Sequence, residues 1–424
     1  MSTSLALESE SLTKPKIKIE NLVKIYGDRS QRALDLFRNG RSRDEILKTT
    51  GSVLGVANVS LSIEEGELFV IMGLSGSGKS TLVRCLNRLI EPTSGHIFID
   101  DEDVTKVSQE RLREIRRTKI SMVFQRFGLL PHKTVLENAE YGLKMRGIPV
   151  EQRRDKALET LEIVGLRQWA DYLPDSLSGG MQQRVGLARA LATDAPILLM
   201  DEAFSALDPL IRRGMQDELM RLQTDLKRTI VFISHDIQEA LKIGDRVAVM
   251  KDGYLVQVGT PEEIVTKPVD NYIAAFTQDV NRAQVLKTGS IVRQTVPFIL
   301  GKGSATAALT NMKSCDRDQM HVVDRHGKPV GILRIDQLEQ AVNAGAQDVE
   351  AVMDSDFPIV ETAASLEEIF HLAQYGNPIA VVNPKGKFKG IVEQSDILAS
   401  IGRLSQEGSE ATPESFELGQ QMAV

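Results

Sequence analysis

The chain has 424 residues, of which 42% are hydrophobic and 26% are charged, and its formal net charge is −7. This is the composition of a globular protein with two or three domains, and the negative charge argues against bulk binding to nucleic acid. No apolar run approaches the roughly 18 residues of a membrane-spanning helix, and residues 1–16 lack the apolar centre of a signal peptide. We therefore expect a cytoplasmic protein whose cysteines, Cys85 and Cys315, are reduced thiols rather than metal ligands.

The first predicted elements are a strand and a helical insertion. Residues 16–20 alternate between charged and apolar side chains, as in a half-buried strand, and Tyr26 follows a few residues later. Tyr26 is a candidate for stacking on an adenine ring, and a buried core aromatic is the alternative interpretation. Residues 28–55 form an insertion with two predicted capped helices, which begin at Ser30 and Ser42. The sheet is expected to resume over residues 56–61.

A glycine-rich loop follows the apolar strand predicted at residues 68–72. Residues 73–81 read GLSGSGKST, which fits G-x-x-x-x-G-K-[ST], and a helix is expected from Thr81 onward. The glycines let backbone N–H groups turn toward one phosphate chain, and the helix N-terminus adds partial positive charge. Lys79 is expected to reach the β- and γ-phosphates of ATP, and the Ser80 hydroxyl to ligate Mg²⁺. The candidate ATP-binding residues here are Gly73, Ser75, Gly76, Ser77, Gly78, Lys79, Ser80 and Thr81.

Gln125 follows the strands predicted at residues 95–100 and 120–124. Parallel α/β sheets bind ligands beyond the carboxyl ends of their strands, so Gln125 is a candidate for contacting Mg²⁺ or the attacking water. Residues 126–178 are mainly helical in pattern, with helices expected over residues 139–145 and 151–164. We interpret this region as a helical subdomain inserted into the sheet domain.

A second anion-binding motif ends the helical region. Ser178, Gly179 and Gly180 stand before a helix predicted at residues 185–192. Such a sequence at a helix N-terminus can bind phosphate. Because one chain then carries two phosphate cradles, we expect the second to serve a nucleotide held by a partner subunit.

Acidic residues and a histidine end two further predicted strands. The apolar strand 196–200 leads to Asp201 and Glu202, whose side chains alternate in direction. Asp201 is therefore predicted to hold the Mg²⁺ shell, and Glu202 to face the water that attacks the γ-phosphate. A strand predicted at residues 229–234 ends at His235, which we expect to contact the γ-phosphate rather than to be structural.

Together these motifs resemble those of ABC-transporter ATPase subunits over about residues 16–270, and we expect the domain to span residues 16–276. The Walker A, Q-loop, signature, Walker B, D-loop and H-loop motifs match residues 73–81, Gln125, 177–184, 197–202, 205–208 and His235. The resemblance implies an α/β P-loop NTPase domain that works as a head-to-tail homodimer. It places ATP between the phosphate loop of one subunit and Ser178–Gly180 of the other. It also implies Glu202 as the general base, His235 and Gln125 as further catalytic residues, and Ser80, Gln125 and Asp201 at Mg²⁺.

The insertion narrows the resemblance to the ATPases of glycine betaine/proline-type osmoprotectant importers. Residues 69–78, 87–93 and 200–212 agree with this subfamily. The likeness implies a peripheral subunit on the cytoplasmic face of the membrane, with permease subunits and a substrate-binding protein on separate chains. It leaves betaine, proline, choline and carnitine open as solutes. A soluble ABC protein of translation or DNA repair and a nucleotide-sensing regulator are the alternative functions.

The C-terminal part contains an internal repeat. Residues 320–333 and 379–392 align without a gap, and each copy is a predicted strand, glycine turn, strand and helix. The repeat resembles an α+β tandem pair of CBS modules, expected at residues 283–342 and 347–402. Asp396 matches a ribose-contacting position of nucleotide-binding pairs, whereas Glu393 and Gln337 depart from that pattern. Adenine-nucleotide binding is therefore the lesser interpretation, beside a module that responds to another signal.

A cluster of lysines is the last feature of the repeat. Nine acidic residues and no Lys or Arg lie between Ile335 and Pro384, and Lys385, Lys387 and Lys389 follow. A solvated hairpin is one interpretation of this cluster. The functional interpretation is contact with anionic lipid or an acidic protein face, which keeps the transporter off at low ionic strength. Residues 403–424 are predicted to be a disordered tail.

Overall fold

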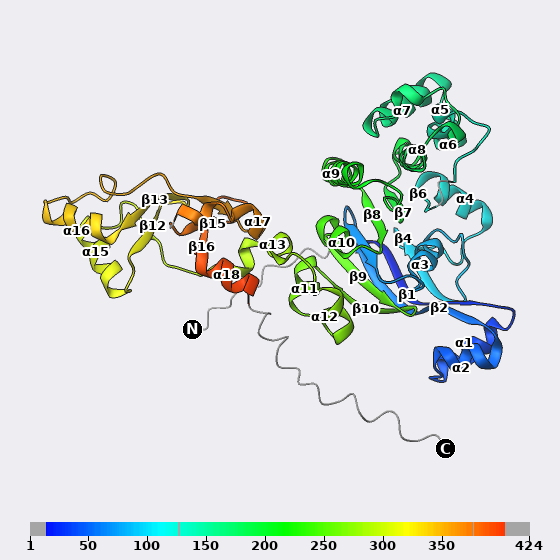
Figure 1. Cartoon of the computed structure of the whole chain (residues 1–424), viewed down its shortest axis with the longest axis horizontal. Coiled ribbons are helices and arrows are strands. Elements are labelled where there is room, and N and C mark those ends of the chain that lie inside the picture. Colours follow the sequence, from blue (N-terminus) through cyan, green and yellow to red (C-terminus); the bar gives the residue numbers. More distant parts are fainter. Residues whose placement is uncertain (1–13, 126–127, 376, 403–424) are drawn as a thin grey trace, which may run out of the picture. The chain divides into compact units, whose positions relative to one another are not determined.

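The computed structural model describes residues 14–125, 128–375 and 377–402 of the chain. It divides into two compact units, which meet in the sequence at Val280 and Asn281 (Figure 1). The predicted tail and the expected start of the helical subdomain, at residues 126 and 127, lie outside the described residues. Within the described ranges, no helix is both long enough and apolar enough to cross a membrane.

A six-stranded sheet with the order β10-β9-β3-β8-β7-β6 forms the centre of the first unit. Its strands are β3 (Leu68–Met72), β6 (Ile120–Val123), β7 (Ile197–Asp201), β8 (Thr229–Ser234), β9 (Arg246–Lys251) and β10 (Tyr254–Gly259). All neighbouring pairs are parallel except β9 and β10. Every residue of β3, β7 and β8 is buried, as the apolar sequences of a doubly covered parallel sheet require. The carboxyl ends of these strands share one edge of the sheet.

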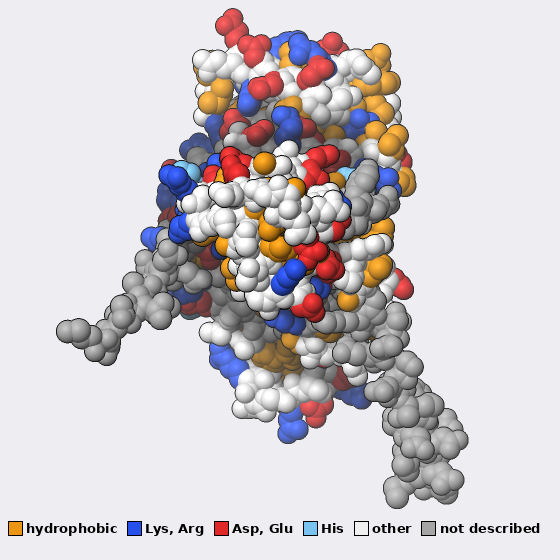
Figure 2. All heavy atoms as spheres, turned by 90° about the vertical axis from the view of Figure 1, so that its left-hand side faces the viewer, with side chains coloured by type: hydrophobic (Ala, Val, Ile, Leu, Met, Phe, Trp, Pro, Cys, Tyr) orange, Lys and Arg blue, Asp and Glu red, His pale blue; other side chains and the backbone are white. Residues whose placement is uncertain are grey.

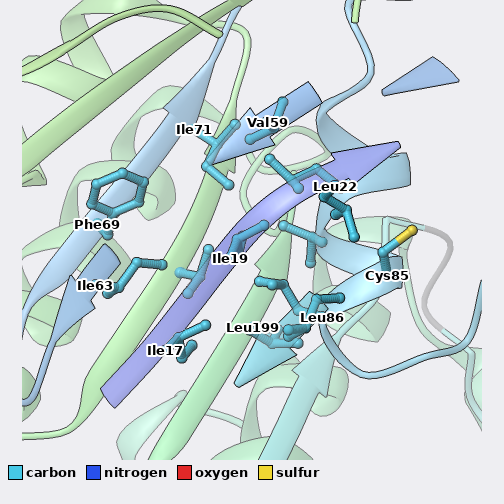
Figure 3. Close-up of a cluster of buried hydrophobic side chains, with 14 of the residues drawn as sticks. Ile17, Ile19, Leu22, Val59, Ile63, Phe69, Ile71, Cys85, Leu86 and Leu199 are labelled. Atoms are coloured by element: carbon cyan, nitrogen blue, oxygen red, sulfur yellow. The ribbon is translucent and has the colours of Figure 1, made fainter. Parts of the chain in front are cut away.

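The strand expected at residues 56–61 pairs with the strand expected at residues 16–20, as predicted, and both lie in a second, antiparallel sheet. The second sheet has the order β2-β1-β4-β5 and consists of β1 (Pro15–Tyr26), β2 (Val53–Glu64), β4 (Ser94–Ile99) and β5 (Glu102–Asp103). Its strands alternate between buried and exposed residues, because only one face meets the core. Figure 3 shows Ile17 and Ile19 of β1 among Phe69 of β3 and Leu86 of the phosphate-loop helix.

The insertion folds into α1 (Ser30–Arg38) and α2 (Arg43–Thr50), which lie together in Figure 1. The predicted cap of α2 is confirmed, since Ser42 forms a capping box with Glu45. The predicted cap of α1 is wrong. Ser30 is already the first helical residue and Arg29 holds the N-cap position, where no side chain bonds to the helix.

Among its described residues, the helical region between β6 and β7 contains four α-helices. They are α5 (Val135–Ala139), α6 (Tyr141–Met145), α7 (Val150–Ile163) and α8 (Gly179–Ala192). The single helix expected over residues 139–145 is thus two short helices separated by Glu140, because a Thr134–Glu137 capping box starts a helix earlier. Likewise α8 begins before Val185, since the Ser178 hydroxyl caps it. The remaining helices of the unit are α3 (Lys79–Leu86), α4 (Gln109–Thr118), α9 (Pro209–Leu226), α10 (Ile237–Ile243), α11 (Pro261–Thr266) and α12 (Asn271–Phe276).

The second unit confirms the internal repeat. Its first copy contains β12 (Gln319–Val323), β13 (Pro329–Arg334) and α16 (Ile335–Asn343), and its second contains β15 (Ile379–Val382), β16 (Phe388–Val392) and α18 (Gln394–Gly402). Both hairpins have a register shift at the corresponding position, and each gains a parallel strand, β11 (Phe298–Ile299) or β14 (Ile359–Glu361). Among the described residues, four α-helices and one 3₁₀ helix complete the unit: α13 (Arg282–Val285), α14 (Thr288–Ile291), α15 (Ala305–Ser314), α17 (Leu366–Ile369) and η3 (Leu372–Tyr375). Figure 2 shows acidic and basic side chains interspersed on the face in view.

A buried histidine breaks the symmetry of the two copies. His321 on β12 is 4% exposed, whereas the aligned residue of the second copy is Ala380. Its ring centroid lies 5.5 Å from those of Phe357 and Phe388, so the imidazole packs against residues of the second copy. Burial lowers the pKa of His321 to about 4, although the backbone of Pro378 opposes the shift.

We therefore expect the second unit to lose stability as the pH falls below 6.5, the ordinary pKa of histidine. The unfolded imidazole takes up a proton there and the folded one does not, so at pH 5 the free energy of unfolding should be lower by about 2 kcal/mol. Urea unfolding at several pH values measures this loss. His321→Ala should remove it and His326→Ala, on an exposed turn, should not. An unchanged pH dependence in His321→Ala would contradict the assignment.

Candidate active site

The phosphate loop between β3 and α3 presents backbone donors without partners. The first hydrogen bond of α3 runs from the Leu82 N–H to the Gly78 carbonyl, at 2.9 Å. In the part of the chain that the structure describes, no acceptor bonds to the N–H groups of Gly76, Gly78, Lys79, Ser80 and Thr81. The start of the helix is therefore open to an anion. Ser75 and Gly76 are exposed on this loop.

Two further features fit a phosphate chain in this loop. The Ser77 hydroxyl is buried and has no hydrogen-bond partner among the described residues. Gly73 has φ +146° and a Cβ there would lie 2.2 Å from the Met250 carbonyl oxygen, so only glycine permits the close turn. The Lys79 ammonium donates to the carbonyls of Gly73 (2.8 Å) and Leu74 (3.0 Å). Burial lowers the pKa of Lys79, while the charges of the nearby carboxylates raise it.

Asp201 lies at the carboxyl end of β7, and its side chain has no exposed surface. Its Oδ1 accepts a hydrogen bond from the Ser80 hydroxyl at 2.8 Å, and its Oδ2 accepts one from Arg84 Nη2 at 3.0 Å. A hydroxyl and a carboxylate are hard oxygen donors of the kind that Mg²⁺ prefers. The structure thus brings Ser80 and Asp201 together as predicted, and it adds Arg84, which sequence reasoning missed. Its position four residues after Ser80 does not by itself indicate this bond, because Asp201 lies 117 positions away in the sequence.

The three predicted catalytic residues meet at one oxygen. Glu202 Oε2 accepts a hydrogen bond from Gln125 Nε2 at 3.0 Å and lies 3.5 Å from His235 Nδ1. Glu202 has φ +49°, in the left-handed region that few residues other than glycine adopt. The Ser205 hydroxyl and Gln183 Nε2 bind its carbonyl, at 2.9 and 3.4 Å. Such strain, held by neighbouring contacts, is typical of functional sites.

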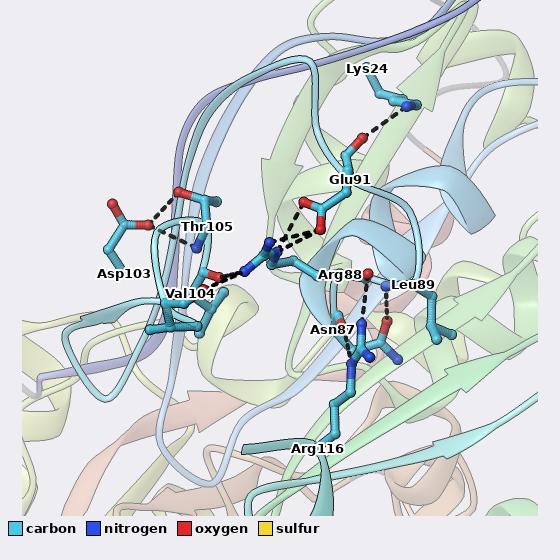
Figure 4. A network of polar contacts seen from close by, with 10 residues as sticks. Lys24, Asn87, Arg88, Leu89, Glu91, Asp103, Val104, Thr105 and Arg116 are labelled. Atoms are coloured by element: carbon cyan, nitrogen blue, oxygen red, sulfur yellow. Dashed lines mark hydrogen bonds and ion pairs between the residues drawn. The ribbon is translucent and has the colours of Figure 1, made fainter. Parts of the chain in front are cut away.

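Tyr26 lies beside the phosphate loop and is not a core residue, so that alternative is wrong. It is 39% exposed, and its hydroxyl is 3.1 Å from Thr81 Oγ1. The Lys24 ammonium lies 5.1 Å from the ring centroid and donates to the Glu91 carbonyl at 2.8 Å. Figure 4 shows this bond and the pairing of Glu91 with Arg88, which together hold the segment after α3.

The second anion-binding motif remains separate from the first within one chain. The Ser178 hydroxyl accepts from the Met181 N–H at 3.4 Å, and Gly179 begins α8. Gly180 packs close to the Ala206 carbonyl. Throughout the described ranges, no hydrogen bond joins these residues to the phosphate loop. One chain therefore presents two candidate anion-binding motifs that are not joined by a hydrogen bond in the described residues.

In the second unit, Asp396 is already paired. It accepts a hydrogen bond from Arg293 Nη2 at 2.6 Å and another from the Glu393 N–H at 2.9 Å. A cleft of about 610 Å³ lies beside it, lined among others by Arg293, Asp316, Asn377, Glu393 and Ser395. Gln337 is exposed on α16. Adenine-nucleotide binding here stays a prediction.

The phosphate loop, the Ser80–Asp201 pair, Glu202 and the separate signature define an ABC-type ATPase. Residues 56–205 match the family described as ABC transporter, and residues 349–403 match the CBS domain family. The chain is 49% identical over 387 residues to the glycine betaine transport ATP-binding protein OpuAA of Bacillus subtilis. This alignment covers 91% of this chain and 92% of OpuAA. It is 48% identical to the glycine betaine/proline betaine transport system ATP-binding protein ProV of Salmonella typhimurium, over 92% of this chain and 98% of ProV. The chain belongs to this family of transporter ATP-binding proteins.

Solved structures agree with this placement. The dimeric structure of MJ0796, a bacterial ABC transporter cassette, is 36% identical with a TM-score of 0.51. The match covers 58% of this chain and 98% of MJ0796. A post-hydrolysis dimer of the same cassette, bound to ADP and Pi, matches with 35% identity and the same TM-score of 0.51.

Proposed function

We propose that this chain is the ATP-hydrolysing subunit of a membrane importer for glycine betaine and related osmoprotectants. The observation that carries the proposal is the convergence of Gln125 and His235 on Glu202, at the sheet edge that also carries the phosphate loop. Relatives named for glycine betaine transport support the solute class. A trimethylamine N-oxide transport ATP-binding protein of Ruegeria pomeroyi is 48% identical over 75% of this chain, so that solute belongs in the test.

Each residue of the site then has a defined task. Lys79 leaves the loop carbonyls to bind the β- and γ-phosphates, and Tyr26 stacks on the adenine. Ser80, Asp201 and Gln125 would hold Mg²⁺, which when bound neutralises phosphate charge. Glu202 takes the proton of the attacking water as general base, and His235 binds the γ-phosphate.

The proposed assembly is a head-to-tail homodimer on the cytoplasmic face of the membrane. Ser178, Gly179 and Gly180 would complete the ATP site of the partner subunit, because no hydrogen bond ties them to their own phosphate loop in the described residues. The dimeric relative supports this arrangement. Permease subunits and a substrate-binding protein are the proposed further partners.

Reconstitution tests the proposal. The chain, co-expressed with candidate permease and binding-protein genes, should purify with the permease, and glycine betaine should stimulate hydrolysis of Mg²⁺·ATP in lipid vesicles. Proline, choline, carnitine and trimethylamine N-oxide are the comparison solutes. ATP hydrolysis without any membrane partner or solute stimulation would favour the soluble ABC protein instead.

We further propose that the tandem modules regulate transport through a cluster of exposed basic residues on the turns of their two hairpins, which we call the basic tip. The turns of the two hairpins lie side by side, since the Phe388 N–H donates to the Gly327 carbonyl at 2.8 Å. The exposed basic residues on these turns are Arg325, His326, Lys328, Lys385, Lys387 and Lys389. None of them forms an ion pair within the described residues. The second hairpin's lysines therefore belong to a larger surface than their sequence indicated, one suited to anionic lipid.

Replacing Lys385, Lys387 and Lys389 by glutamine should leave transport active at low salt in anionic vesicles. Each lysine near such a surface contributes about 1 kcal/mol, so the inhibited state should weaken by on the order of 100-fold. Hydrolysis and uptake measured against salt concentration should give a flattened activation curve. Lys287→Gln, which removes an exposed lysine elsewhere in the unit, is the charge control. A triple variant with the parent's salt threshold would exclude this cluster as the sensor.

A further inference from the structure

Arg84 and Ser80 reach the same carboxylate from one helix. They are four residues apart on α3, a spacing that places them on one helical face. Ser80 binds Oδ1 of Asp201 and Arg84 binds Oδ2, so both carboxylate oxygens have a donor. The side chain of Asp201 is 0% exposed and that of Arg84 is 38% exposed. The guanidinium thus extends from solvent to a fully buried acid.

We propose that Arg84 is a positioning residue for the Mg²⁺ site. Its bond fixes Oδ2, which leaves Oδ1 with the Ser80 hydroxyl, and its charge compensates the buried carboxylate before a metal arrives. The inference rests on the proposed function and assigns that site a further residue.

Lys79, the other cationic residue of the site, does not compensate the Asp201 carboxylate through a direct bond. The Lys79 ammonium donates to the carbonyls of Gly73 and Leu74 and not to Asp201. Among the described residues, Arg84 is therefore the only cationic side chain bonded to this carboxylate. Removing one partner of a buried ion pair leaves an uncompensated charge, which is much more costly than losing an exposed pair.

The destabilisation caused by removing Arg84 should consequently depend on whether Mg²⁺ is bound. Without Mg²⁺, an Arg84→Met chain has a buried carboxylate with only a hydroxyl partner. With Mg²⁺·ATP, the ion supplies positive charge at the Ser80–Asp201 pair and takes over part of the compensation. An ordinary surface ion pair would show no such dependence.

Thermal unfolding of the full chain tests this, followed in EDTA, in ATP with EDTA, and in ATP with Mg²⁺. Arg84→Met should lower the unfolding temperature of the ATPase unit in EDTA by at least about 6 °C, and saturating Mg²⁺·ATP should recover half or more of the loss. Arg84→Lys, which keeps the charge, should lose less. Arg111→Met is the matched control, because Arg111 is 41% exposed and pairs with Glu102 and Glu114, which are 28% and 50% exposed. It should shift unfolding by less than about 3 °C with or without Mg²⁺.

The double variant Arg84→Met/Asp201→Asn tests the inference even if Arg84→Met alone does not fold, because the double variant should then still fold. It removes both charges, so its unfolding temperature in EDTA should exceed that of Arg84→Met. The inference is overturned if the double variant is no more stable than Arg84→Met. It is equally overturned if Arg84→Met behaves like Arg111→Met, or if its loss is the same with and without Mg²⁺. A parent chain that Mg²⁺·ATP does not stabilise would instead overturn the proposed function.

Discussion

Glu202→Gln is expected to lower the rate of ATP hydrolysis by about 10²–10⁴-fold, the usual cost of losing a general base. Glutamine keeps the shape and the hydrogen-bonding capacity of Glu202 but cannot accept the proton of the attacking water. The contacts of the Glu202 carbonyl with Ser205 and Gln183 involve the backbone and should persist, so the loop itself should not change. ATP should still bind and hold the dimer closed.

The measurement is the rate of phosphate release by the purified transporter, together with ATP binding by the same sample. Glu151→Gln, an exposed glutamate on α7, is the control and should keep the parent rate. A Glu202→Gln transporter that hydrolyses ATP at the parent rate would remove Glu202 from the role of general base. A variant that no longer binds ATP would show that Glu202 shapes the binding site.

The local parts of the site could be predicted from the sequence because each depends on neighbouring residues. The phosphate loop needs a strand, glycines and a helix in order, and residues 68–86 encode all three. Gln125 and His235 were expected at strand ends for the same reason. Gln125 and His235 meet on Glu202 because the sheet order β8-β7-β6 brings the ends of three strands together. The periodicity of the sequence does not specify this order.

The features that were missed all depend on tertiary contacts. The bond of Arg84 to Asp201 joins residues 117 positions apart, so its spacing from Ser80 had no visible meaning in the sequence. The choice between the two interpretations of Tyr26 could not be made from the sequence, because its exposure depends on how β1 ends beside α3. The basic tip of the second unit combines two turns that the alignment treats as equivalent copies, and only their packing makes them one surface.

Ser178→Arg is expected to abolish ATP hydrolysis by the dimer while each monomer still binds ATP. The arginine would occupy the space of the partner's γ-phosphate, whereas the phosphate loop of the same chain has no hydrogen bond to Ser178 in the described residues. Losing the cap of α8 costs about 1 kcal/mol by itself. Ser108→Arg, which removes the corresponding cap of α4, controls for that loss and should remain active. ATP binding by the isolated chain and hydrolysis by the assembled transporter are the two measurements.

Mixing Ser178→Arg with Lys79→Ala subunits tests the shared site most directly. A mixed dimer has one site with an intact phosphate loop and an intact signature, while its other site carries both defects. Random pairing makes half of the dimers mixed, so hydrolysis should return to about a quarter of the parent rate if the sites act independently. Neither variant alone should be active. Mixtures that stay inactive would contradict a composite site, and loss of ATP binding in Ser178→Arg monomers would place the signature at the nucleotide of its own chain.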